Sequence, residues 1–298
     1  MPSAPSPAPA SEKDLPDRAP WRCPSCGVSG DGRFCSACGE KRLDRSDLTL
    51  RHLVREALDA FTQLDGRLGS TLVALLTRPG ALTAAWLEGR RRPYLGPAQI
   101  FVLANVVFFL VQWATRLDIL SVPLRAHLDG QFYSAWAQRA VQARLAAHGL
   151  AFEAFAQRFD QLTDLQARTL VIVMAPAFAL VCAAILAHRR RPAAAHLTFA
   201  LHLFAFLMLA ISVVFLATAL FLLVVGRMGL SPSPHSVDWA VSAIELSLCV
   251  AFLWPALRRV YGLRPLPRAA ATAALLAVVP VLLFGYRLLL LVLTLHTA

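Results

Sequence analysis

Four of the six cysteines are spaced for metal binding. Cys23 and Cys26 form one Cys-x-x-Cys pair, and Cys35 and Cys38 form a second pair after an eight-residue spacer. A glycine follows each pair and permits the left-handed turn that brings backbone amides toward the sulfurs. Four thiolates complete a closed tetrahedral shell, which is typical of structural zinc. We therefore predict a zinc ribbon over residues 21–42, with no open coordination position for catalysis.

Two alternatives remain for these cysteines. Two disulfides would require an oxidising compartment, and a redox or iron site is the other possibility. The remaining cysteines, Cys182 and Cys249, lie in apolar segments and are predicted to be small packing residues.

Polar residues inside apolar segments form the second group of candidates. Glu245 and Arg287 carry the charges deepest in such segments, and Asn105 is an amide in the first of them. Such residues are functional candidates in a membrane because their burial is costly. Glu245 and Arg287 could form an ion pair or take part in transport. Alternatively, Arg287 extends to the headgroups and Glu245 is protonated or hydrogen-bonded, while Asn105 bonds a neighbouring helix.

Three histidines, His188, His196 and His202, lie near the start of the third apolar segment. Imidazoles can bind a metal or contact a lipid phosphate. A spacing of six places His196 and His202 on different sides of a helix, which favours interfacial polar residues over a shared site.

An arginine-rich turn precedes the first apolar segment. Arg90, Arg91 and Arg92 are consecutive, and Tyr94 follows them. Each cation near an anionic membrane surface gains about 1 kcal/mol, and tyrosine is a common interfacial anchor. These four residues are therefore predicted to contact lipid headgroups.

The composition indicates that a membrane surrounds the elements carrying these groups. The chain has 298 residues, of which 57% are hydrophobic and 16% charged, with a mean hydropathy of +0.56. Soluble domains average about 45–50% apolar and about 25% charged residues, so a wholly soluble fold is excluded. The net charge of +11 also raises nucleic-acid binding. That partner is not expected, because the arginines adjoin a membrane segment and the cysteine segment is nearly balanced in charge.

Five apolar segments are long enough to cross about 30 Å of hydrocarbon. We predict an all-α integral membrane protein with about five transmembrane helices and a small N-terminal zinc ribbon. The helical transmembrane domain covers 93–298, and its predicted spans are about 97–115, 169–187, 197–225, 238–257 and 269–294.

Three further segments complete the predicted organisation. Residues 1–20 have the composition of a disordered leader and lack a secretory signal. Residues 43–92 are predicted to form amphipathic interfacial helices, and residues 116–168 an outer helical loop.

The orientation follows from the basic residues of the flanks. From residue 41 onward, the flanks on the N-terminal side of the bilayer carry 17 Lys and Arg residues and those on the other side carry 7. Positive charge is retained in the cytoplasm. We therefore predict an inner-membrane protein with a cytoplasmic N-terminus and an external C-terminus.

Several motifs occur in a characteristic order. After the cysteine pairs come Arg78-Pro79-Gly80, Gly89-Arg90-Arg91 with Tyr94 and Pro97, His196-Leu-Thr-Phe-Ala-Leu-His202 and Arg259-Val-Tyr261-Gly262. This order resembles the domain-of-unknown-function 3667 family of bacterial membrane proteins, although Pro93 departs from its pattern. The resemblance implies an integral membrane protein with an N-terminal zinc-ribbon-like segment, and it supplies no catalytic residue.

These features favour a non-enzymatic adaptor or regulatory protein in the lipid bilayer, whose zinc ribbon binds a cytosolic protein partner. The first alternative is a small-solute or lipid transporter that uses the intramembrane polar residues. The second is a membrane enzyme that acts on lipid headgroups through the three histidines.

Overall fold

The computed structural model describes residues 20–43, 67–115, 120, 122–129 and 131–297. The predicted leader, apart from residue 20, and residues 44–66 of the predicted interfacial segment lie outside the described residues. The predicted all-α class is confirmed, since helices dominate the described chain and the N-terminal segment contains two short strands. Strand β1 (Trp21–Arg22) pairs antiparallel with β2 (Ser29–Gly30).

The helices follow one another with short connections. In chain order they are α2 (Arg67–Thr77), α3 (Ala81–Leu87), α4 (Pro97–Thr115), α5 (Leu124–Leu128), α6 (Ser134–His148), α7 (Phe152–Ile185), the 3-10 turn η4 (Ala187–Arg189), α8 (Ala193–Arg227), α9 (Pro234–Tyr261) and α10 (Pro265–Thr297).

The described chain contains four helices that are each long and apolar enough to cross a membrane, namely α4, α8, α9 and α10. A fifth span exists if α7 counts as one bent unit, because its two parts, Phe152–Ala167 and Leu170–Ile185, meet at 54°. The prediction placed a separate span at 169–187. In the structure that apolar segment continues a polar helix from the preceding loop, since no Gly or Pro stops the helix between them.

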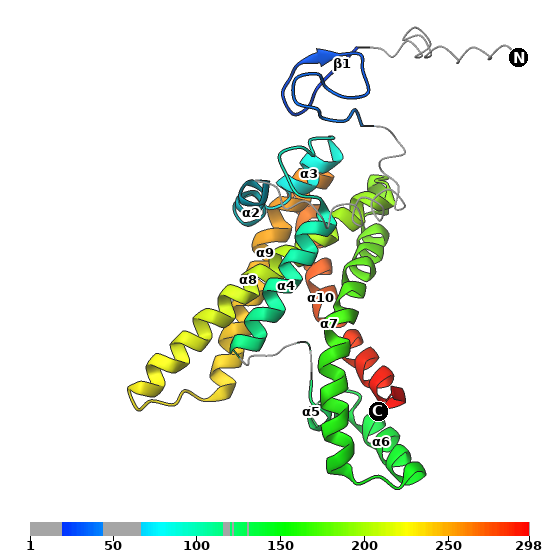
Figure 1. Ribbon diagram of the computed structural model, residues 1–298, viewed down its shortest axis with the longest axis vertical. Helices are drawn as coiled ribbons and strands as arrows, with labels where there is room; N and C mark the ends of the chain where they lie inside the picture. The colour runs from blue at the N-terminus through cyan, green and yellow to red at the C-terminus, as the bar shows by residue number, and fades with distance from the viewer. Residues whose placement is uncertain (1–19, 44–66, 116–119, 121, 130, 298) are drawn as a thin grey trace, which may run out of the picture.

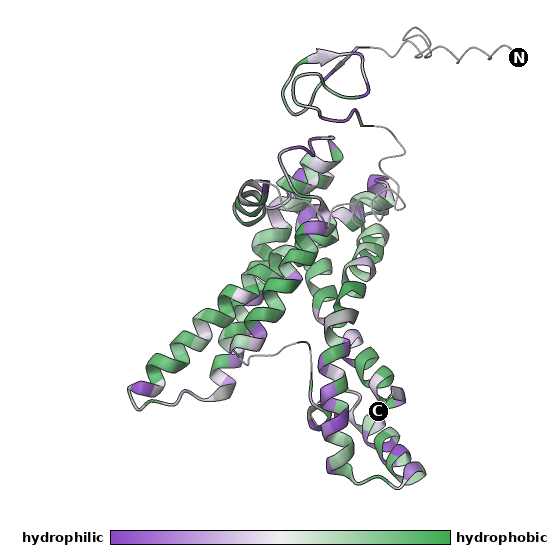
Figure 2. Cartoon of the chain, viewed as in Figure 1, coloured by the Kyte–Doolittle hydropathy of each residue, from purple (hydrophilic) through white to green (hydrophobic). Residues whose placement is uncertain are grey.

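The long helices form two limbs that are joined at the end nearest the β1–β2 hairpin. Helices α4, α8 and α9 run along one limb, and α7 and α10 run along the other, where α5 and α6 lie at its tip (Figure 1). Apolar residues dominate the middle of both limbs, while polar residues gather near α2 and α3 and around α6 (Figure 2). This distribution is the one expected of a bilayer-spanning bundle.

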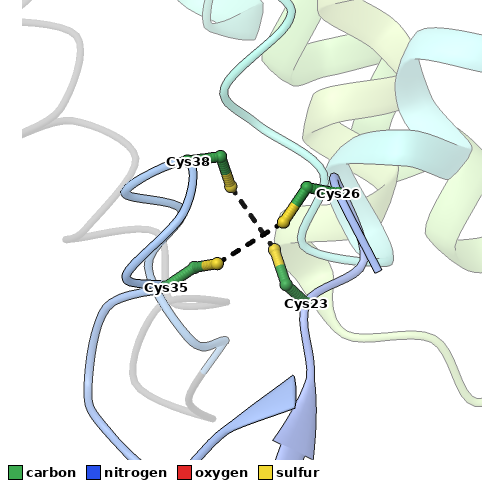
Figure 3. A group of neighbouring side chains, drawn as sticks. All are labelled: Cys23, Cys26, Cys35 and Cys38. Carbon is green, nitrogen blue, oxygen red and sulfur yellow. Dashed lines mark hydrogen bonds between the residues drawn. The ribbon is translucent and has the colours of Figure 1, made fainter. Parts of the chain in front are cut away.

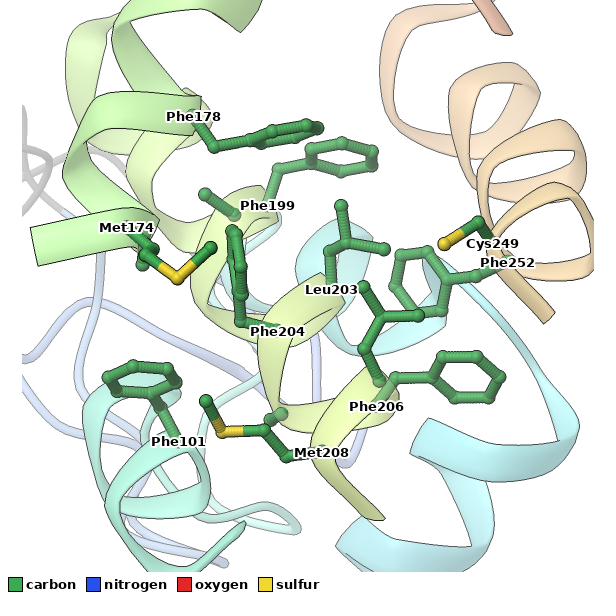
Figure 4. Packing of buried hydrophobic residues seen from close by; sticks show 14 of the residues in the cluster. Phe101, Met174, Phe178, Phe199, Leu203, Phe204, Phe206, Met208, Cys249 and Phe252 are labelled. Atoms are coloured by element: carbon green, nitrogen blue, oxygen red, sulfur yellow. The ribbon is translucent and has the colours of Figure 1, made fainter. Parts of the chain in front are cut away.

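Helix α8 is central to the main core. Its Phe199 and Leu203 are fully buried, and Phe204 makes an edge-to-face contact with Phe178 of α7 at a centroid distance of 5.8 Å (Figure 4). A smaller cluster at the opposite end joins Leu291 of α10 to the α5–α7 segment. Helix α10 packs in both clusters and so connects the main core to the α5–α7 segment.

Helix α3 lies directly against α9. Gly80 has a φ of 80°, and a Cβ built on it would lie 2.7 Å from the Cα of Ala256. The guanidinium of Arg259 donates a hydrogen bond to the carbonyl of Pro79 at 2.6 Å. The Arg78-Pro79-Gly80 motif therefore fixes a close backbone approach between α3 and α9.

Candidate metal centre and intramembrane polar groups

The four N-terminal cysteines come together in two matching turns. The N–H of Cys23 donates to Val28 and that of Gly27 to Cys23, each at 2.9 Å, and the second turn repeats this pattern from Cys35 to Glu40. Gly27 and Gly39 have φ values of 79° and 69°, as the predicted left-handed turns require. The local spacing thus suffices to build both halves of the site.

The geometry of the sulfurs suits a single metal ion. All four Sγ atoms lie within 4.8 Å of one another, and none is in a disulfide. The Sγ atoms of Cys23 and Cys38 are 3.6 Å apart, and those of Cys26 and Cys35 are 3.5 Å apart (Figure 3). A tetrahedral ion with bonds of about 2.3 Å separates its sulfurs by about 3.8 Å, so the cluster fits such an ion after small shifts of the sulfurs.

Electrostatics at the cluster favour a bound cation. Backbone N–H groups of Cys38 and Ala37 lower the pKa of the Cys35 thiol to about 6. At Cys38 the backbone N–H of Glu40 acts in the same direction, yet desolvation and the neighbouring sulfurs raise the pKa to about 12. Four thiolates at this spacing repel one another, and a divalent cation removes that repulsion.

Glu40 connects the cysteine module to the helical domain, a role that the sequence reasoning missed. Its side chain is 3% exposed, and one carboxylate oxygen accepts hydrogen bonds from the Ser25 hydroxyl at 2.6 Å and from the backbone N–H groups of Arg91 and Arg92 at 3.1 and 2.9 Å. A carboxylate held by consecutive N–H groups forms a strong, charge-assisted contact. The only signal in the sequence was the position of an acid next to the second cysteine pair.

The side chains of the arginine turn contact other residues of the protein. Arg90 pairs with Glu88, and the guanidinium of Arg91 lies 4.3 Å from the ring centroid of buried Trp86. The guanidinium of Arg92 packs over Gly39 so closely that a Cβ there would lie 2.1 Å from it. Tyr94 packs against the main core. Contact of these four residues with lipid headgroups stays a prediction.

His196 and His202 are both buried, and each has its own hydroxyl partner. His196 Nδ1 lies 2.9 Å from the Tyr261 hydroxyl and its ring stacks on that residue, whereas His202 Nδ1 lies 2.9 Å from the Thr83 hydroxyl. His188 is exposed. In the described part of the chain, the cysteines are the one group of three or more ligands close enough to hold a metal. The structure therefore does not bring the histidines into a shared site, and His196 and His202 join α8 to α9 and α3.

Arg287 lies near the α5–α6 segment. Its positive charge acts on His127, whose pKa is lowered to about 4 chiefly by burial and further by Arg287. His127 Nδ1 lies 2.8 Å from the Tyr133 hydroxyl. The sequence reasoning missed this buried group because its members come from α5, the loop before α6, and α10.

Glu245 and Asn105 lie elsewhere in the membrane region. Glu245 lines a cavity between the limbs, and its Oε1 is buried with no hydrogen-bond partner among the described residues. Asn105 donates to the carbonyl of Phe101 in its own helix at 2.8 Å. The structure thus separates the candidate intramembrane residues into different surroundings.

The fold and the cysteine cluster define a helical membrane protein of four to five spans with a small cysteine-rich N-terminal module. A family model described as a protein of unknown function (DUF3667) matches residues 65–109. This match confirms the family resemblance for the segment that contains α2, α3, the arginine turn and most of α4. No curated protein and no solved structure matches the chain.

Proposed function

We propose that this protein is a non-enzymatic membrane adaptor whose zinc ribbon binds a cytosolic protein partner at the inner membrane. The observation that carries the proposal is the Glu40 contact, because it attaches the cysteine module to the arginine turn that precedes α4. A module held in this way has a defined position relative to the bilayer, which a recruiting surface requires.

Zinc is the metal that this donor set favours. Four thiolates in a closed tetrahedral shell are typical of structural zinc sites, and all four positions are filled by protein. A segment of some 20 residues cannot bury a core of its own, so metal binding supplies the free energy of folding. The excess of basic residues near the module supports a cytoplasmic position, where thiols stay reduced.

The module also offers an apolar surface for a partner. Val28 is 43% exposed and Phe34 is 58% exposed, and the Arg33 guanidinium lies 5.9 Å from the Phe34 ring centroid. Exposed aromatic and arginine side chains are enriched at protein interfaces. Phe34 is therefore the residue that we assign to partner contact.

Affinity capture from solubilised membranes tests this function. The intact chain is compared with Phe34→Ala, which leaves the cysteines in place, and with the double variant Cys23→Ser and Cys26→Ser. We expect one polypeptide to be enriched by the intact chain and lost with both variants, while zinc content, measured by atomic emission, is lost only in the cysteine variant. Enrichment that is equal in all three samples contradicts the proposal.

Transport of a small solute or lipid is a second candidate. It is favoured by one observation, which is that Oε1 of Glu245, at a cavity within the membrane region, has no hydrogen-bond partner among the residues that the structure describes.

A further inference from the structure

A cavity of about 230 Å³ lies between the two limbs of the membrane domain. All five long helices contribute to its wall, which is largely apolar and includes Phe108, Met174, Phe204 and Leu283. Met174, Phe204, Met208 and Cys249 line the cavity, and Figure 4 labels all four among the buried residues of the main core. The walls therefore suit an apolar group that enters from the bilayer.

The polar side chains that line this cavity are those of Ser242, Glu245 and Cys249. Glu245 brings a carboxyl group whose Oε1 has no partner in the described chain. Leu276 and Pro280 of α10 both line the cavity. In a regular helix the N–H of residue 280 would donate to the carbonyl of Leu276, but proline has no N–H. The cavity thus presents the Glu245 carboxyl group to a ligand, and the α10 turn in its wall contains a carbonyl that lacks its helical donor.

No cation in the described wall balances Glu245. None of the residues that line the cavity is Arg, Lys or His. Arg287, the ion-pair partner considered from the sequence, acts on His127 and Tyr133 of the α5–α6 segment. An unpaired carboxylate in a membrane is costly, and a bound cation with N–H donors offsets that cost.

We propose that this cavity binds the ammonium group of a small amphiphilic amine, with Glu245 as its counter-ion and the apolar wall around its hydrocarbon part. An apolar cavity of about 150 Å³ admits benzene, so the space here accepts a phenyl ring with a short chain. It is smaller than a typical drug-sized site of roughly 300–1,000 Å³. The inference depends neither on the metal centre nor on the adaptor function, and it concerns binding alone.

The test uses the full chain in phosphatidylcholine nanodiscs and the probe 4-(4-fluorophenyl)butylamine, followed by fluorine NMR. The neutral control is 4-(4-fluorophenyl)butanol, which has the same body and no charge. We expect saturable amine binding that weakens at least 10-fold in Glu245→Gln and does not change in Glu153→Gln, an exposed acid at the start of α7. The alcohol should bind at least 10-fold more weakly than the amine.

Equal amine binding to the wild type and Glu245→Gln overturns the proposal, as does alcohol binding as tight as that of the amine. If Glu245→Gln does not fold, Ile211→Phe takes its place, because Ile211 lines the cavity and the larger side chain fills it. That variant should also weaken amine binding at least 10-fold, and unchanged binding counts against the cavity.

The ammonium group can belong to a free amine or to a lipid headgroup. Adding phosphatidylethanolamine to the nanodiscs separates the two sources. Competition that lowers the apparent affinity of the wild type for the probe identifies the lipid ammonium, whereas an unchanged affinity identifies the free amine.

Discussion

Glu40 makes a contact whose strength comes from charge and burial together. Its carboxylate is nearly inaccessible and accepts three hydrogen bonds, two of them from the backbone of the arginine turn. Hydrogen bonds to charged groups contribute about 1.5–3 kcal/mol each, more than neutral ones. The Glu40 contact therefore helps to orient the cysteine module, beside the packing of Arg92 over Gly39.

Glu40→Gln should loosen the module without removing the metal. The amide keeps one acceptor oxygen but loses the charge, so we expect faster hydrogen exchange at residues 90–92 and unchanged zinc content. Glu88→Gln is the matched control, because the Glu88–Arg90 pair is exposed and such pairs contribute about 1 kcal/mol or less. Unchanged exchange in Glu40→Gln would contradict the assigned role.

Thr83 and His202 form a buried hydrogen-bonded pair between α3 and α8. Both side chains are buried, so removing one partner leaves the other unsatisfied at a cost of about 1–3 kcal/mol. Thr83→Val and His202→Phe should each lower the Tm in detergent, and the double variant should lower it by less than the sum. Strictly additive effects would show that the two groups are not coupled.

The elements differ in how far the sequence predicts them. Two cysteine pairs spaced along a short segment specify their own turns, so the cluster could be predicted from local pattern alone. Glu40 meets a turn 51 and 52 residues later in the chain, and only the folded structure shows that contact. Helical structure was expected both in residues 116–168 and in the span that follows, but their continuity in α7 was missed because hydropathy changes where the helix does not end.

Gly80 allows the start of α3 to lie close to the backbone of α9. Gly80→Ala would place a methyl group 2.7 Å from the backbone of Ala256 and would also strain a left-handed residue. Overpacking costs about 1–3 kcal/mol and the left-handed conformation about 1–2 kcal/mol. We expect a large fall in Tm.

Gly149→Ala is the matched control for this substitution. Gly149 also has a positive φ, of 64°, but nothing lies within 4 Å of a Cβ built there. It should show only the conformational cost, and equal losses of Tm in the two variants would mean that the α3–α9 contact is not tight.

At the scale of the whole molecule, α7 decides the topology. Its apolar part, Leu170–Ile185, is about 24 Å long at 1.5 Å per residue, which is shorter than a bilayer core of about 30 Å. The helix therefore needs part of its polar half to cross. If it crosses, the spans number five and the two ends of the chain lie on opposite sides.

Reporter fusions measure on which side of the membrane each end of the chain lies. Alkaline phosphatase, which is active only outside the cytoplasm, should be active when fused after Thr297, and a fluorescent protein fused at the N-terminus should be fluorescent inside the cell. A C-terminal fusion without phosphatase activity, despite normal expression, would indicate four spans with both termini on one side.

Glu40 precedes Arg91 of the arginine turn by 51 residues in the sequence, and this order matters while the protein is being synthesised. The ribosome synthesises the cysteine module before the turn that receives it, and at roughly 5–20 residues per second the two are made about 3–10 s apart. During that interval the module has no docking partner, and if it binds zinc as proposed, it depends on that metal to stay folded. Metal loading should thus precede membrane insertion of α4, which makes the nascent chain sensitive to zinc supply before its first span exists.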